Sequence, residues 1–180
     1  MNDANENIRS EIALLGEPVL RQIAESIDDV TSTGIQQLAQ TMLFTLEGSN
    51  GVGLAAPQIF ESKRIIVVAS KPTSRYPYAP EMPAMVMINP EFSPLSDVMI
   101  KDYEGCLSIP SIRALVPRYH SIRVTYTDLT GQRLDVDFEG FIARVFQHEY
   151  DHLNGLVYLD RVDNNQDIIS EAMFLKLIAT

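Results

Sequence analysis

The sequence predicts an α+β fold in which short, mostly antiparallel strands surround one central helix, with a further helix towards each end of the chain. Several short apolar stretches between residues 65 and 138 are separated by turn residues, which is typical of strands in an antiparallel sheet. Apolar residues recur at helical spacing over residues 33–47, 141–154 and 168–178. The middle one of these helices is the candidate for the central, metal-binding element.

Length and composition favour one soluble domain. The chain has 180 residues, of which 46% are hydrophobic and 21% charged, so we expect a single domain over residues 1–180 with a loose tail at 1–10. The net charge of −10 argues against direct contact with nucleic acid or with an anionic membrane surface. Without a long apolar run or a visible signal peptide, the protein is expected to be cytoplasmic.

Turn residues divide the middle of the chain into strands. We expect strands over residues 65–69, 84–88, 98–103, 112–117, 121–127 and 133–138. The turn signal Asn89-Pro90 ends the second of these strands. Residues 71–83 contain four prolines, so they are expected to form an irregular loop, either an inert surface loop or a lid.

The central helix carries the main chemical signal. His148 and His152 are four residues apart, so on a helix they share one face and can reach a single metal ion. Glu149 lies beside them and can accept a proton from water that the metal activates. Phe141 and Val145 extend the same face as an apolar stripe, which predicts a buried helix. The alternative is an ordinary helix with two core histidines.

Two histidines supply only two ligands, so a third must come from elsewhere. Cys106, the one cysteine, follows a glycine near the end of an expected strand, and Cys with two His would leave one position open for water. The alternative is that Cys106 is a buried apolar residue. His120 competes as third ligand, but it lies in a turn between strands and is expected to face solvent.

Three segments together resemble the signature motifs of the peptide deformylase family. They are Gly51-Val52-Gly53-Leu54-Ala55-Ala56-Pro57-Gln58, Glu104-Gly105-Cys106-Leu107-Ser108 and Gln147-His148-Glu149-Tyr150-Asp151-His152-Leu153-Asn154-Gly155, in the family's order. The resemblance covers roughly residues 12 to 160. It implies a metal-dependent hydrolase, acting on linear amides, that removes the N-terminal formyl group from formyl-methionine of newly made polypeptides and releases formate.

The resemblance also implies roles for individual residues. Cys106, His148 and His152 would hold one divalent metal ion, with Fe²⁺ as the native metal and Zn²⁺, Ni²⁺ or Co²⁺ as substitutes in purified protein. Glu149 would act as general base and then general acid. Gln58 and the backbone N–H of Leu107 would bind the formyl oxygen.

Substrate contacts are expected from the residues around this centre. The glycines beside Val52 would let the backbone pair with the substrate as an added strand, and Phe141 and Val145 would line the methionine pocket. The expected substrate-binding residues are Val52, Gly53, Gly105, Arg113, Phe141 and Val145. Arg144, one turn before His148, is expected to narrow or polarise the mouth of the pocket.

Expected partners are formyl-methionyl nascent chains. Some family members end in a basic helix that docks on the ribosome, but Lys176 is the only basic residue after Arg161, so that contact is not expected here. A monomer or weak dimer is expected. The competing interpretations are a zinc endopeptidase, which the cysteine ligand disfavours, and a non-catalytic relative, which the intact set of Gln58, Cys106 and Glu149 disfavours.

Overall fold

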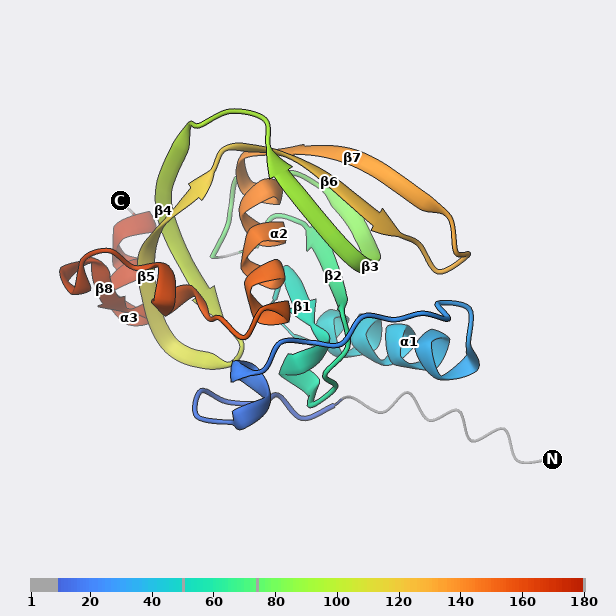
Figure 1. Cartoon of the computed structure of the whole chain (residues 1–180). Helices are drawn as coiled ribbons and strands as arrows, with labels where there is room; N and C mark the ends of the chain where they lie inside the picture. Colours follow the sequence, from blue (N-terminus) through green and yellow to red (C-terminus); the bar gives the residue numbers. More distant parts are fainter. Residues whose placement is uncertain (1–9, 50, 74, 180) are drawn as a thin grey trace.

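The computed structural model confirms the α+β class and places one helix at the centre of the molecule (Figure 1). It describes residues 10–49, 51–73 and 75–179, so most of the expected tail at 1–10 lies outside the described residues. The helices are α1 Thr33–Glu47, α2 Gly140–Leu153 and α3 Glu171–Ile178. Within the described part of the chain, no helix is long and apolar enough to cross a membrane.

The strands form two antiparallel sheets. One sheet has the order β1-β2-β3-β6-β7, and its strands are Gly53–Ala55, Ile65–Ser70, Met82–Pro94, Ser121–Thr127 and Arg133–Glu139. The other has the order β4-β5-β8, and its strands are Met99–Cys106, Ile109–Tyr119 and Ile168–Ser170. In Figure 1, α2 stands between β4 and β5 on one side and β3, β6 and β7 on the other.

Helix α2 is buried on nearly all of its faces. Every residue from 143 to 149 and from 151 to 153 is buried, whereas a helix on a protein surface buries one stripe only. Val145 and Phe146 pack in the core formed with the five-stranded sheet. The helix ends before Gly155, whose φ of +72° favours glycine and whose Cβ would lie 2.8 Å from the carbonyl oxygen of Arg21.

A tight hairpin brings Cys106 to this helix. Strand β4 runs to Cys106, which pairs with Ile109 across the two-residue turn Leu107-Ser108. A two-residue connection fixes the register of both strands. The cysteine is therefore held at the end of a regular strand, three residues later than the end expected for this strand.

The expectation that a strand ends at Asn89-Pro90 was wrong. Strand β3 continues to Pro94, and its pairing with β6 shifts register between Ile88 and Glu91. This bulge accommodates Pro90, which has no N–H to donate, and Asn89, whose φ is +48°. The Asn89 side chain is held by hydrogen bonds with both backbone groups of Ile27.

The expected helix over 168–178 was also wrong at its start. Residues Ile168–Ser170 pair with β5 as strand β8, and the helix begins only at Glu171. Ser170 caps that helix, because its hydroxyl accepts a hydrogen bond from the N–H of Met173. Strand β1 was not expected either, since three residues are too few for a periodic signal.

Candidate active site

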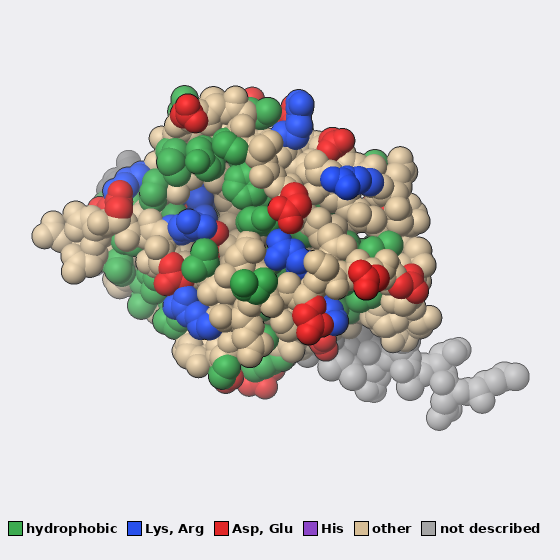
Figure 2. Space-filling view, in the orientation of Figure 1, with side chains coloured by type: hydrophobic (Ala, Val, Ile, Leu, Met, Phe, Trp, Pro, Cys, Tyr) green, Lys and Arg blue, Asp and Glu red, His purple; other side chains and the backbone are tan. Residues whose placement is uncertain are grey.

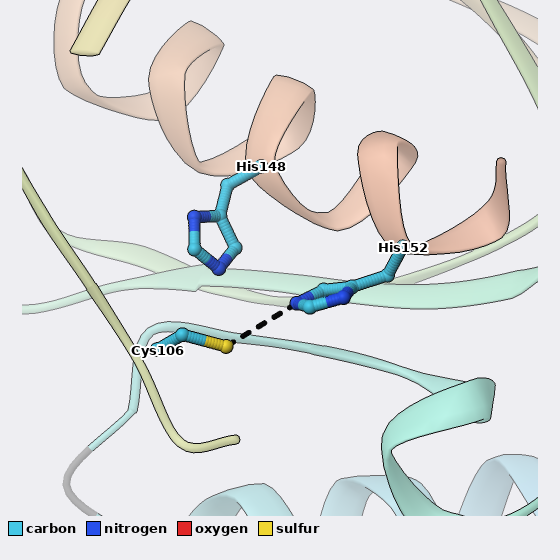
Figure 3. A group of neighbouring side chains, drawn as sticks. All are labelled: Cys106, His148 and His152. Atoms are coloured by element: carbon cyan, nitrogen blue, oxygen red, sulfur yellow. Dashed lines mark hydrogen bonds between the residues drawn. The ribbon is translucent and has the colours of Figure 1, made fainter. Parts of the chain in front are cut away.

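Three ligand atoms converge where β4 meets α2. The donor atoms of Cys106, His148 and His152 all lie within 4.8 Å of one another, and the Cys106 Sγ is 3.3 Å from the His152 Nε2 (Figure 3). His120 does not belong to this group. Its Nδ1 lies 3.1 Å from the Ser121 hydroxyl. His120 was expected to face solvent, but it is half-buried.

The orientation of His148 is set by a buried carboxylate. His148 Nδ1 lies 2.9 Å from Glu104 Oε2, which leaves the other ring nitrogen directed at Cys106 and His152 (Figure 3). Glu104 also accepts two hydrogen bonds from Arg118, at 2.8 and 3.0 Å. Burial alone raises the pKa of Glu104, but the charge of Arg118 and these hydrogen bonds outweigh it and hold the pKa well below its usual range.

The same arginine ties this carboxylate to the helix that bears the histidines. Arg118 Nη1 donates to Asp151 Oδ2 at 2.6 Å, and Asp151 accepts two further hydrogen bonds from Arg161. Asp151 lies between the two histidines in sequence. The buried ion pairs of Arg118 with Glu104 and Asp151 therefore connect the helix that carries the metal ligands to strands β4 and β5.

Glu149 has a different environment from Glu104. Its side chain is buried, and among the described residues its Oε2 is one of two buried side-chain atoms with no hydrogen-bond partner, the other being His152 Nδ1. Burial raises the pKa of Glu149 to about 7. A Cβ on Gly53 would lie 2.3 Å from Glu149 Oε1, so the glycine makes room for this carboxylate.

Gln58 is buried next to Cys106 rather than exposed after a turn. Its Oε1 accepts a hydrogen bond from the N–H of Ala55 at 2.9 Å, which fixes which way the amide points. Its Nε2 then lies 3.3 Å from the Cys106 Sγ and 3.2 Å from the hydroxyl of Ser108. The amide N–H group is therefore aimed at the metal-ligand cluster before any ligand binds.

A pocket of about 80 Å³ opens beside this cluster. It is lined by the expected residues Val52, Gly53, Gln58, Gly105, Cys106, Leu107, Arg113, Phe141, Val145, His148 and Glu149. Of the expected site residues, only His152 does not line it, because it lies deeper, with none of its surface exposed. Residues from all three sequence motifs thus meet in one cavity.

The rim of the pocket is built by segments outside the motifs. Arg113 donates to the Tyr76 hydroxyl at 2.7 Å and to Glu171 at 2.9 Å, and its guanidinium lies over Gly105, where a Cβ would be 2.4 Å away. Arg75 pairs with the same Glu171 oxygen at 2.8 Å. The Pro-rich loop therefore supplies part of the pocket wall, and the first residue of α3 holds both arginines.

Arg144 was expected at the mouth of the pocket, but it is buried in the pocket wall. It lines the wall but is 7% exposed, and its guanidinium donates to the carbonyl oxygens of Ile100 and Val116 and to Glu104. Its charge is thus used to join α2 to strands β4 and β5. The expectation failed because helical spacing gives the face of a residue but not the direction of a long side chain.

The donor set fits a divalent metal ion. A cysteine thiolate with two imidazoles is a ligand set for zinc or iron that leaves a fourth position open. Burial lowers the pKa of His152, which keeps its ring neutral and able to donate a lone pair to a cation. The buried Glu149 Oε2 has no hydrogen-bond partner among the described residues, and a water molecule at a catalytic metal would use such an acceptor.

Several residues of the site were missed from the sequence. Glu104 and Asp151 lie inside the recognised motifs, next to metal-ligand candidates, and their acidic character was the available signal. Arg118 and Glu171 lie outside them, on separate elements. Their positions depend on long-range packing, which local spacing does not report.

Comparison with known proteins agrees with this geometry. A family model described as polypeptide deformylase matches residues 9–167. A protein named peptide deformylase 2 from a Nostoc strain is 44% identical over 167 residues, covering 93% of each chain. A protein named peptide deformylase 1 from Nitrosomonas europaea is 43% identical, covering 83% of this chain and 85% of that one.

Solved structures of the same kind have the same fold. The Met-Ala-Ser-bound class I type b peptide deformylase from Acinetobacter baumannii matches with a TM-score of 0.84 and 44% identity, covering 87% of this chain and 99% of that chain. Peptide deformylase from Thermotoga maritima matches with a TM-score of 0.78 and 33% identity, covering 87% and 99%. The chain therefore belongs to the polypeptide deformylase family, whose members are metal-dependent hydrolases that remove the N-terminal formyl group from nascent polypeptides.

Proposed function

We propose that this chain removes the formyl group from formyl-methionyl polypeptides by hydrolysis at a metal ion held by Cys106, His148 and His152. One observation carries the assignment: that ligand cluster meets the oriented amide of Gln58 and a buried carboxylate oxygen, Glu149 Oε2, that has no hydrogen-bond partner among the described residues. When bound, a divalent ion supplies Lewis-acid activation of water and of the formyl carbonyl. The remaining steps belong to the protein's own side chains.

Glu149 is proposed as the general base and then the general acid. A pKa of about 7 lets a carboxylate accept a proton from the attacking water and return it to the leaving amine at neutral pH. In the part of the chain that the structure describes, its Oε2 has no hydrogen-bond partner that would compete for that proton. Gly53 keeps the space beside the carboxylate clear of a side chain.

Gln58 and the backbone N–H of Leu107 are proposed to bind the formyl oxygen as it gains negative charge. The Gln58 amide is already held in place by Ala55 and Ser108, so it need not reorganise during the reaction. Leu107 lies in the two-residue turn directly after Cys106, which places its backbone beside the ligand cluster.

The pocket beyond the cluster is proposed to take the methionine side chain. Phe141 and Val145 supply its apolar wall, and Tyr76 packs on Phe141 with ring centroids 4.9 Å apart. Val52, Gly53 and Gly105 also line the pocket and are proposed to pair with the substrate through their backbone, and Arg113, which lines the pocket too, is proposed to lie along the path of the peptide. Nascent polypeptides with N-terminal formyl-methionine are the proposed substrates, and residues 1–180 are proposed to act as one catalytic domain in the cytoplasm.

Fe²⁺ is proposed as the native metal, with Zn²⁺, Ni²⁺ or Co²⁺ able to replace it. The ligand types accept all four ions, so the choice rests on supply and redox conditions. Metal analysis of protein purified anaerobically, paired with activity before and after exposure to air, tests this choice. Air-stable activity from protein that contains only zinc would refute the iron assignment.

Release of formate from formyl-Met-Ala-Ser tests the reaction itself. Replacing Glu149 by Gln keeps the size of the side chain but removes the base, so kcat/KM should fall by about 10²–10⁴-fold. The metal content of Glu149→Gln should stay unchanged, because Glu149 is not proposed as a ligand. Full activity in this variant would overturn the proposed role.

A further inference from the structure

The chain continues beyond the family match at residue 167 with β8 and α3. Both elements lie beside β5 in Figure 1, and β8 extends the sheet that contains β4 and β5. Strand β5 carries Arg113, whose side chain lines the catalytic pocket. The residues after the family match are therefore attached to a strand of the pocket wall. We call residues 168–178 the C-terminal segment.

The C-terminal segment pairs with β5 at the position of Arg113. In the register of the two strands, Ile169 lies opposite Arg113, and the next pair joins Ser170 to Ile112. Directly before β8, the residue Asp167 forms an ion pair of 2.9 Å with Lys101 of β4. The backbone that carries the Arg113 side chain is thus held by the strand that follows the family match.

Helix α3 presents two groups to the guanidinium of Arg113. Glu171 Oε1 accepts a hydrogen bond from Arg113 Nη2 at 2.9 Å. Phe174 comes three residues later, on the same side of the helix, and the guanidinium carbon lies over its ring, 5.1 Å from the centroid. Phe174 is 4% exposed and also packs on Tyr103, with ring centroids 5.4 Å apart. A charge and an aromatic face from one helix therefore hold the same guanidinium.

The alternative is that Phe174 only covers the face of the small sheet. Two contacts favour a role in the pocket. The Arg113 side chain is 5% exposed, and a cation–π contact is stronger at such a desolvated site than at the surface. The same guanidinium lies against Gly105, where a Cβ would be 2.5 Å from the guanidinium carbon, and Gly105 directly precedes Cys106. A guanidinium released from Phe174 would therefore move within the pocket wall.

We propose that Phe174 is a positioning residue for substrate binding: its ring, together with the Glu171 carboxylate, holds the Arg113 guanidinium in the pocket wall. The inference rests on the proposed function, because it assigns Phe174 a role in binding the formylated peptide. Phe174 acts through Arg113 and does not belong to the described residues that line the pocket. The C-terminal segment thus adjusts the affinity for substrate and takes no part in the chemistry at the metal-ligand cluster.

Phe174→Leu tests this role, because it keeps an apolar side chain at a buried position but removes the aromatic face. With formyl-Met-Ala-Ser as substrate, KM should rise by about three- to tenfold, the scale of a cation–π contact, while kcat and metal content stay at the wild-type values. An unchanged KM would overturn the proposal. A fall in kcat or in bound metal would overturn it too, since Phe174 would then act through the ligand cluster.

Three further variants separate the aromatic contact from packing. Phe174→Tyr keeps the ring, so its KM should stay near the wild-type value. Met173→Leu changes an exposed side chain of the same helix and should leave KM unchanged. In Arg113→Met the partner of the ring is absent, so adding Phe174→Leu should raise KM no further. Equal rises in Phe174→Leu and Phe174→Tyr, or a full effect of Phe174→Leu without Arg113, would show that the ring does not act on Arg113.

A stability measurement separates failure of this inference from failure of the proposed function. Urea unfolding of the wild type, Phe174→Leu, Arg113→Met and the double variant should show non-additive changes, whatever the activity, because the two side chains are in contact. Additive changes would mean that Phe174 does not hold Arg113. If the wild type releases formate and Phe174→Leu has the same KM, only the positioning role fails. If the wild type releases no formate, the proposed function fails, and the role in substrate binding fails with it.

Discussion

The two ends of the catalytic pocket hold their charged groups in different ways. At the metal-ligand end, Arg118, Glu104 and Asp151 have side chains that are only 3–5% exposed, and all are joined by short hydrogen bonds. At the rim, Arg75 is 31% exposed and Glu171 is 22% exposed, and both come from segments outside the motifs, whereas Arg113, the other partner of Glu171, is 5% exposed. Figure 2 shows one face of the molecule, where Lys and Arg side chains alternate with Asp and Glu.

This difference in burial predicts different consequences of substitution at the two ends of the pocket. Buried charges are costly unless all are paired, so the network around Glu104 fixes one arrangement of the ligands and does not tolerate loss of a partner. Exposed ion pairs contribute little to stability and are screened by water and salt. We therefore expect substitutions at the buried end to change stability and chemistry, and substitutions at the rim to change substrate binding alone.

The largest effect is expected from Arg118→Met. The substitution leaves Glu104 and Asp151 buried without their main partner, which should lower the free energy of unfolding by about 3–5 kcal/mol. Urea unfolding at pH 7, at equal metal loading, measures this change. Arg123→Met is the matched control, because it breaks an exposed ion pair with Asp137 and should hardly move the unfolding midpoint. Similar losses in both variants would remove the distinction between buried and exposed pairs.

Gly53→Ala should damage the chemistry of the buried end. The new Cβ would overlap the Glu149 carboxylate, which would have to move away from the pocket, and we expect kcat/KM to fall by about 10²-fold, the low end of the effect of losing a general base. Gly34→Ala is the control, since its new Cβ would have no atom within 4 Å apart from those of its chain neighbours and of its own helix backbone. Activity of Gly53→Ala at the wild-type level would mean that the position of Glu149 is not critical.

Glu149 should also make the metal-free protein less stable at high pH. Its pKa is raised from 4.5 to about 7, so the folded state holds this proton more tightly than the unfolded state does. Stability from this group is therefore fully present below pH 4.5 and is lost as pH rises through 7. Above pH 7, metal-free Glu149→Gln should be more stable than the wild type by about 1–3 kcal/mol.

The two proteins should converge in stability near pH 4.5. Thermal unfolding in the presence of a chelator, scanned from pH 4.5 to pH 8.5, measures the difference. A difference that is constant with pH would show that the buried carboxylate is not the cause.

The motifs predicted the ligand cluster at the buried end, but neither the ion-pair network around that cluster nor the rim. Helical spacing placed His148 and His152 on one face, and the motif order identified Cys106, which the structure brings to them. Both features are local in sequence. The whole family resemblance lies in such local segments, so it predicts the residues of the site and the class of the fold.

The remaining errors arise from interactions between distant segments. The bulge at Asn89-Pro90 exists because Asn89 binds the backbone of Ile27, and strand β8 exists because β5 offers an unpaired edge. The clustering of Arg113 with Glu171 joins residues 58 positions apart. No periodicity within one segment carries this information, so these features follow only from the assembled fold.

The smallest effect is expected from Glu171→Gln at the rim. The substitution removes the charge that holds Arg75 and Arg113, so KM for formyl-Met-Ala-Ser should rise by about two- to fivefold, the scale of a weak ion pair, while kcat and metal content stay unchanged. Glu17→Gln, at an exposed glutamate, is the control for charge alone. The rise in KM should shrink in Arg75→Gln, because part of the interaction is already lost there. A fall in kcat or in bound metal would mean that the rim and the ligand cluster are mechanically coupled, and the division between the two ends of the pocket would fail.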